Sequence, residues 1–127
     1  MVGYVGHIEE DTLQNTNFRK VIFSTQHLQL VLMSLKPNEE IGTEVHTTTD
    51  QFFRVESGEG KVVMNGEETL IKDGDVVVVV AGTTHNLINL SATADLKLYT
   101  IYAPSHHVDG TIHATKADAE ADMKDHL

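Results

Sequence analysis

Four polar side chains of this sequence have the types and spacing of a metal-binding set. Glu44 and His46 are two residues apart, Gln51 opens the next predicted strand, and His85 follows a later turn. Because side chains two apart on a strand share a face, Glu44 and His46 project together. A buried carboxylate beside an imidazole is costly unless its charge is compensated, and a metal ion compensates it. Fe(II), Mn, Ni, Co and Zn accept two imidazoles and one carboxylate.

The same spacing allows a second arrangement, in which the strand carrying Glu44 and His46 faces solvent and Val45 points inward. The pair His106-His107 is placed to cover the mouth of a barrel. Apart from that option, the remaining histidines fall in predicted loops or termini and are interpreted as surface residues: His7, His27, His106, His107, His113 and His126.

Composition restricts the classes of protein that this chain can belong to. Its 127 residues predict one domain, and the absence of cysteine excludes disulfides and thiolate metal sites. A formal charge of −10 argues against nucleic acid and against an anionic membrane surface as partners. No apolar run reaches the ~18 residues of a spanning helix. The first seven residues lack the pattern of a signal peptide. We therefore expect a cytoplasmic protein.

Short strands separated by turn residues dominate the chain. Asn65-Gly66 between two strand-like runs is a strong hairpin signal, because both turn positions need positive φ. Five consecutive valines from Val76 are β-branched and disfavour a helix. The predicted strands cover residues 19–25, 28–35, 39–47, 51–56, 61–64, 67–71, 76–80, 85–90 and 96–102.

This pattern predicts an all-β protein, a barrel or sandwich whose core spans about residues 20–103. An N-terminal arm, residues 1–18, precedes the core, and Glu9 to Asp11 can open a helical turn there. A loop and a short, solvated helix over 115–127 follow it, with Thr115 as N-cap and Asp118 at the capping-box position. A small barrel has a mouth in which a ligand can bind.

The sequence resembles the cupin superfamily, in particular its small single-domain members. In their first motif, Glu44-Val45-His46 stands in place of His-x-His, Gln51 in place of Glu, and Gly58 is the closing glycine. The second motif runs Gly, five residues, Pro-x-Gly, two residues, His, three residues, Asn. This chain keeps every spacing of it, and the matching residues are Gly74, Val80-Ala81-Gly82, His85 and Asn89.

Four positions depart from the family pattern. Asn38 replaces the first glycine and Val80 replaces the proline, while Glu44 and Gln51 replace a histidine and a glutamate. The usual ligand set of three His and one Glu becomes Glu, His, Gln, His, which also carries one negative charge. The resemblance thus implies a single cupin domain over residues 1–127 with one divalent metal ion (Fe, Mn, Zn or Ni) held by Glu44, His46, Gln51 and His85.

Cupin relatives include isomerases, lyases and dioxygenases, so the resemblance implies a metal-dependent enzyme. The chain has nine Lys and Arg, and strand alternation puts Arg54 on the face opposite Gln51, which disfavours a phosphorylated substrate. We expect a small sugar-like or hydroxy-carbonyl compound. A non-catalytic small-molecule-binding homodimer is the alternative, since cupins commonly pair through sheet faces. The sequence identifies no catalytic residue, phosphate loop or dinucleotide fingerprint.

Overall fold

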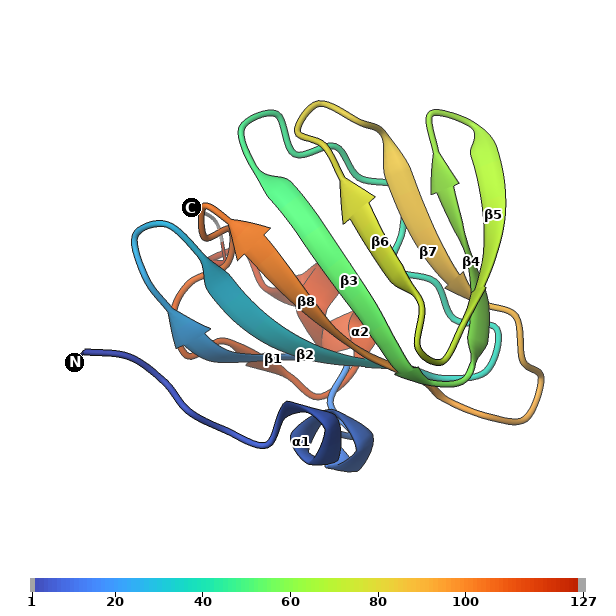
Figure 1. The fold of residues 1–127 in the computed structure, drawn as a ribbon, viewed down its shortest axis with the longest axis horizontal. Helices are drawn as coiled ribbons and strands as arrows, with labels where there is room; N and C mark the ends of the chain where they lie inside the picture. The colour runs from blue at the N-terminus through green and yellow to red at the C-terminus, as the bar shows by residue number, and fades with distance from the viewer. Residues whose placement is uncertain (1, 126–127) are drawn as a thin grey trace.

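Two antiparallel sheets face each other in this protein, and together they form a jelly-roll-like sandwich with an open side (Figure 1). The structure is a computed structural model that describes residues 2–125. In the large sheet the strand order is β6-β3-β8-β2-β1-β9, and in the small sheet it is β5-β4-β7. The all-β prediction is therefore confirmed, with two separate sheets in place of one closed barrel.

The described residues contain nine strands and two short helices. The large sheet consists of β1 (Arg19–Ser24), β2 (Gln29–Leu35), β3 (Asp50–Ser57), β6 (Val76–Val79), β8 (Leu96–Ala103) and β9 (Ile112–His113). The small sheet consists of β4 (Glu59–Met64), β5 (Glu67–Lys72) and β7 (His85–Asn89). Helix α1 (Ile8–Gln14) lies at one end of the large sheet, and α2 (Lys116–Ala121) lies behind it (Figure 1). Neither helix has the length and apolar character needed to cross a membrane.

Alternating side chains from both sheets fill the space between them. Along β6, Val77 and Val79 are buried while Val76 and Val78 are exposed, as the pleat of a strand requires. Each buried aliphatic or aromatic side chain contributes roughly 1.5–3 kcal/mol to stability. The core is formed by Phe18, Val21, Val31, Met33, Leu35, Phe53, Val55, Val62, Ile71, Val77, Val79, Leu87, Leu96, Leu98 and Tyr102.

The structure agrees with the sequence at two turns and at one helix cap. Asn65 and Gly66 have φ values of 50° and 83° and connect β4 to β5, as the hairpin signal predicts. Asn38 adopts a φ of 62° where the family pattern has glycine. At the other end of the chain, the Thr115 side chain accepts a hydrogen bond from the backbone N–H of Asp118 and caps α2.

Three predictions about elements need correction. Residues 39–47 do not form a strand. Gly42, at a φ of 107°, interrupts the extended backbone, and only two isolated bridges pair this segment with β7. Helix α2 ends at Ala121, well before the predicted end at 127, and residues 126 and 127 lie outside the described part. The short strand β9, which pairs with β1, was not predicted.

Candidate metal centre

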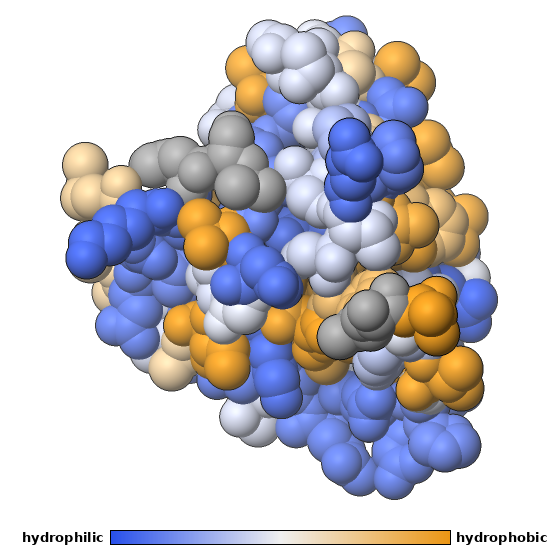
Figure 2. Space-filling view, turned by 90° about the vertical axis from the view of Figure 1, so that its left-hand side faces the viewer, coloured by the Kyte–Doolittle hydropathy of each residue, from blue (hydrophilic) through white to orange (hydrophobic). Residues whose placement is uncertain are grey.

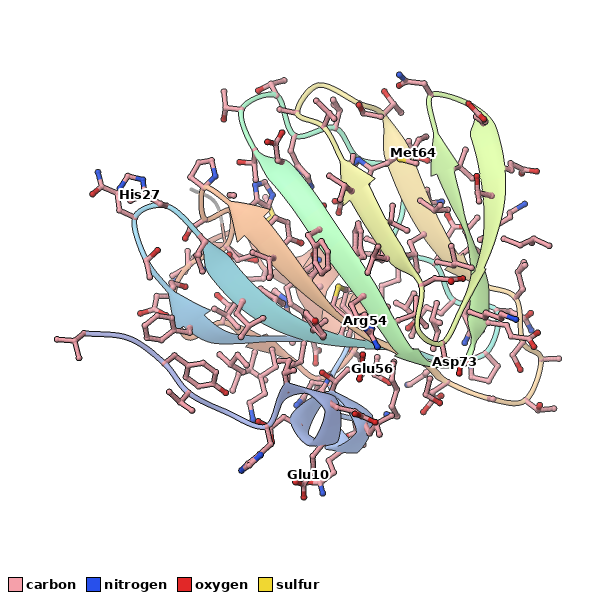
Figure 3. The ribbon with its side chains drawn as sticks, viewed as in Figure 1. Glu10, His27, Arg54, Glu56, Met64 and Asp73 are labelled. Atoms are coloured by element: carbon pink, nitrogen blue, oxygen red, sulfur yellow. The ribbon has the colours of Figure 1, made fainter. Side chains whose placement is uncertain are left out.

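The four predicted side chains gather at one end of the sandwich, where β3 and β7 begin. Gln51 lies near the start of β3 and His85 at the start of β7, while Glu44 and His46 come from the segment between β2 and β3. Met64 marks this end in Figure 3, because it pairs with His85 across β4 and β7. The fold thus brings together residues that are up to 41 positions apart in the sequence.

Backbone hydrogen bonds hold the segment that carries Glu44 and His46. The backbone N–H groups of Glu44 and His85 each donate to the carbonyl of the other residue, both at 2.8 Å. The carbonyl of His46 accepts from the N–H of Gly82, also at 2.8 Å. Val45 is 51% exposed and His46 only 8% exposed. The alternative arrangement, with Val45 inward, is therefore wrong.

The polar atoms of this cluster converge on one point. Ligand atoms of Glu44, His46 and His85 all lie within 4.8 Å of one another, so this group could hold a metal ion. Glu44 Oε2 lies 2.9 Å from His46 Nε2 and 3.9 Å from His85 Nε2. Gln51 Oε1 lies 3.2 Å from the same nitrogen of His85. These atoms are the kinds of ligand that divalent transition metals accept.

The protons in this cluster are too few for its acceptors. His85 Nδ1 lies 3.0 Å from the carbonyl oxygen of Thr83, which can only accept, so a neutral His85 keeps its proton there. Its Nε2 is then an acceptor that faces two others, the oxygens of Glu44 and Gln51. The Gln51 amide is oriented by its own N–H, which donates to the Thr100 hydroxyl at 3.0 Å.

His46 also has a ring nitrogen without a hydrogen bond. His46 Nε2 lies 2.9 Å from Glu44 Oε2, close enough for an electrostatic contact, but the two atoms are not aligned for a hydrogen bond. No other residue that the structure describes pairs with this buried nitrogen. Buried polar atoms are almost always satisfied, so an unpaired nitrogen that faces a carboxylate needs an explanation. A cation between these acceptors, either a metal ion or an additional proton, removes the conflict. The residues present therefore fit a metal ion.

Glu44 carries the negative charge of the cluster. Burial alone would raise the pKa of the Glu44 carboxyl group. Contact with His46, supported by Arg19 and His85, outweighs burial and holds this pKa below its ordinary value. Glu44 is therefore an anion at neutral pH, which is the form that binds a cation.

A cavity of about 370 Å³ opens beside His46. Its walls carry hydroxyl groups and imidazoles, and no Lys or Arg lines it. The lining residues are Val45, His46, Thr47, Thr48, Thr49, Pro104, Ser105 and His106. The ring centroids of His106 and His46 are 4.1 Å apart, so His106 lies at the mouth of the site, as the sequence allowed. Burial, and the nearby His46, lower the pKa of His106.

The C-terminal segment contributes a second group of buried polar residues. His107 and His113 are 6% and 4% exposed, so their interpretation as surface residues was wrong. His107 contacts the Asp125 carboxylate through Nδ1 at 2.5 Å and the Tyr102 hydroxyl through Nε2 at 3.1 Å. Burial lowers the pKa of His107 and raises that of Tyr102, so both are neutral at neutral pH.

His113 has equally specific partners. Its Nε2 lies 2.9 Å from Asp122, and its Nδ1 lies 3.3 Å from the guanidinium of the buried Arg19. The two acid–histidine pairs are each formed within the C-terminal segment, 9 and 18 residues apart. No periodicity in the sequence pointed to them, because each pair joins residues from different parts of this segment through tertiary packing.

A family model described as a cupin domain matches residues 31–102. The chain is 45% identical over 124 residues to an uncharacterized protein, YrkC, of Bacillus subtilis, and this match covers 93% of the chain and 66% of YrkC. It is 44% identical over 113 residues to an uncharacterized protein of Acanthamoeba polyphaga mimivirus, with coverage of 86% and 70%. The chain thus spans about two thirds of the length of these curated relatives.

Solved structures agree with this match. BH2720 from Bacillus halodurans superimposes with a TM-score of 0.91 at 42% identity, and the match covers 94% of both chains. KdgF from Halomonas sp. gives a TM-score of 0.64 at 24% identity, over 68% of this chain and 77% of that one. The second likeness is one of fold alone.

Proposed function

Because the chain belongs to the cupin family, we propose that it is a small metal-binding enzyme. Its substrate would be a small sugar-like or hydroxy-carbonyl compound, and its reaction would be of the isomerase, lyase or dioxygenase type. The observation that carries this proposal is the cluster of acceptors from Glu44, His46, Gln51 and His85, which lacks the protons to satisfy itself. One divalent ion (Fe, Mn, Zn or Ni) would complete it.

The four side chains would hold the ion through two imidazole nitrogens, one carboxylate oxygen and one amide oxygen. When bound, such an ion polarises a carbonyl or enediol oxygen as a Lewis acid. Thr83 and Thr100 would orient two of these ligands, because they hydrogen-bond to the ring of His85 and to the amide of Gln51. Outer partners of this kind orient metal ligands and tune their basicity.

The charge of the mouth cavity supports a neutral substrate. Its hydroxyl and imidazole groups suit hydrogen bonds with a polyol or hydroxy-carbonyl compound, and the cavity has no cationic side chain for a phosphate. Arg54 lies on the outer face of the large sheet, where it pairs with Glu56 at 2.9 Å (Figure 3). A phosphorylated substrate therefore has no partner among the lining residues.

Turnover separates the enzyme from the alternative, a binding module. The metal-loaded, tag-free protein is incubated with a panel of small hydroxy-carbonyl compounds, and the mixture is followed by proton NMR. An enzyme converts at least one compound and loses this activity in the Glu44→Ala/His85→Ala variant. A compound that binds saturably and is recovered unchanged would instead support the non-catalytic module.

We also propose that the protein is a homodimer, and the outer face of the large sheet supports this. Direct cross-strand partners place one apolar row across five strands, in the order Val78, Phe52, Ile101, Leu30 and Phe23. Val78 is 59% exposed, and the others are partly exposed. Hydrophobic side chains also gather along the right-hand side of Figure 2, which is the sheet face turned to the viewer in Figure 1. Contiguous apolar surface of this kind typically marks an interface.

Phe52→Lys is expected to convert the dimer into a monomer, because it places a charge in the middle of the apolar row. Light scattering at micromolar concentration should give twice 14.0 kDa for the wild type and 14.0 kDa for the variant. Leu70→Lys, on an exposed position of β5 in the other sheet, is the matched control and should remain dimeric. A wild-type protein that is entirely monomeric would refute the dimer.

A further inference from the structure

His106 differs from three buried histidines, His85, His107 and His113, and from its neighbour His46, which belongs to the group that could hold a metal. His85, His107 and His113 each have both ring nitrogens near a hydrogen-bond partner. Within residues 2–125, no group hydrogen-bonds to either ring nitrogen of His106, whose only hydrogen bond comes from its backbone. The ring lines the mouth cavity beside His46, but it is outside the group that could hold a metal.

The backbone of His106 is nevertheless held firmly. Gln29 is completely buried, and its Oε1 accepts the N–H groups of His106 at 3.2 Å and His107 at 2.9 Å. Its Nε2 donates to the His107 carbonyl at 2.7 Å and to the Ser24 hydroxyl at 2.8 Å. Three of the four hydrogen bonds of the buried Gln29 amide therefore go to the backbone of His106 and His107. Burial of an amide is favourable only when it is paired.

A second clamp acts from the C-terminus. One Asp125 oxygen accepts from the Val108 N–H at 2.7 Å, and the other contacts the His107 ring. That ring in turn holds the hydroxyl of Tyr102. The Tyr102 ring stacks on His106, with centroids 5.4 Å apart and planes inclined by 23°. Backbone and ring of His106 are therefore both positioned, and only its nitrogens remain available.

We propose that His106 is the residue that transfers the substrate proton at this centre, with Gln29 and Asp125 as its positioning residues. The proposal rests on the proposed function and deepens it. A neutral imidazole has one nitrogen that accepts a proton and one that donates it. Preorganised groups of this kind typically contribute 10²–10⁴-fold to a rate. His106 and His46, a member of the acceptor cluster, line the same cavity, which a hydroxy-carbonyl compound would enter beside the cluster.

The step is the removal of a proton from the carbon next to a carbonyl. The C–H bond breaks, its proton moves to the free nitrogen of His106, and its electron pair forms the double bond of an enediolate. The negative charge then lies on the former carbonyl oxygen. The imidazolium returns the proton to the same carbon, which restores the starting compound. Alternatively, the hydroxyl proton of the enediolate moves to the former carbonyl oxygen and the imidazolium protonates the neighbouring carbon, which gives the isomer. Neither route needs an oxidant, a reductant or a leaving group.

Dihydroxyacetone is a suitable probe, because each of its CH₂OH groups adjoins the carbonyl. Zinc-loaded protein in D₂O should replace these protons with deuterium and form glyceraldehyde, which proton NMR detects. His106→Gln is expected to reduce the exchange rate by about 10²–10⁴-fold. It should keep its metal, by elemental analysis, and its affinity for the probe, measured by relaxation of the probe protons with manganese-loaded protein.

His27→Gln is the matched control, since His27 is exposed at the turn between β1 and β2 (Figure 3). It should exchange at the wild-type rate. Asp125→Asn should lower the exchange rate while probe affinity stays unchanged, which a purely structural role would not predict. Wild-type exchange in His106→Gln, metal loss in that variant, or metal-loaded wild type that exchanges no faster than buffer would overturn the proposal. Wild-type protein that binds no metal would instead contradict the proposed function itself.

Discussion

Saturating zinc(II) or manganese(II) is expected to raise the melting temperature of the tag-free protein by about 10 °C. A ligand that binds the folded state alone stabilises it by about 2.7 kcal/mol when its concentration is 100 times Kd. For a chain of this length, that free energy corresponds to roughly this temperature shift. The physical reason is the cluster of Glu44, Gln51 and His85, whose facing acceptors lack a cation. Differential scanning fluorimetry with and without metal measures the shift.

His46→Ala and His85→Ala should each abolish this shift, since each removes an imidazole nitrogen from the group that could hold a metal. His27→Ala removes an exposed histidine and serves as the control, so its shift should equal that of the wild type. A shift that survives in both cluster variants would place the metal elsewhere on the protein.

Asn89→Ala is expected to destabilise the protein by about 3 kcal/mol and to lower the melting temperature by roughly 10 °C. Asn89 is 1% exposed, and its side-chain nitrogen lies within hydrogen-bonding distance of three backbone carbonyls, those of Leu35, Lys36 and Ala94. Its oxygen accepts from the Ser91 N–H. Truncation removes these hydrogen bonds, although the Lys36 carbonyl keeps a backbone donor, the Glu39 N–H. Thermal unfolding followed by circular dichroism measures the loss.

Asn89→Asp tests whether this role depends on the amide or on size. Aspartate matches asparagine in shape but turns an acceptor towards the three carbonyls, so we expect it to destabilise the protein at least as much as alanine does. An aspartate variant with wild-type stability would contradict this account. The closing asparagine of the second sequence motif thus connects two loops, while its histidine belongs to the acceptor cluster.

Most of the fold followed from local patterns. Short apolar runs between turn residues identified β2, β3 and β8, and Asn65-Gly66 identified the β4–β5 hairpin from its need for positive φ. The segment over residues 39–47 has the composition of a strand, but Gly42 breaks it. Gly42 adopts a positive φ that ends the extended backbone. The pattern of apolar and polar residues around it gave no sign of this break.

The candidate site was only partly accessible from the sequence. The two-residue spacing predicted that Glu44 and His46 share a face, and the spacing of the second motif predicted that His85 lies beside them. The structure brings these three residues together. The burial of His107 and His113 could not be predicted, because their partners Asp125 and Asp122 lie in a tail whose acidic residues suggested a solvated surface. Contacts of this kind depend on tertiary packing and carry no periodicity.

Elemental analysis by mass spectrometry of the tag-free protein, beside the Glu44→Ala/His85→Ala variant, tests the metal site most directly. The wild type should contain close to one divalent ion per chain, and the variant should contain none. Iron would direct the search to oxygen chemistry, and zinc or manganese would direct it to isomerases and lyases. Wild-type protein that holds no metal after incubation with these ions, or a variant that keeps its metal, would contradict a metal site formed by Glu44, His46, Gln51 and His85.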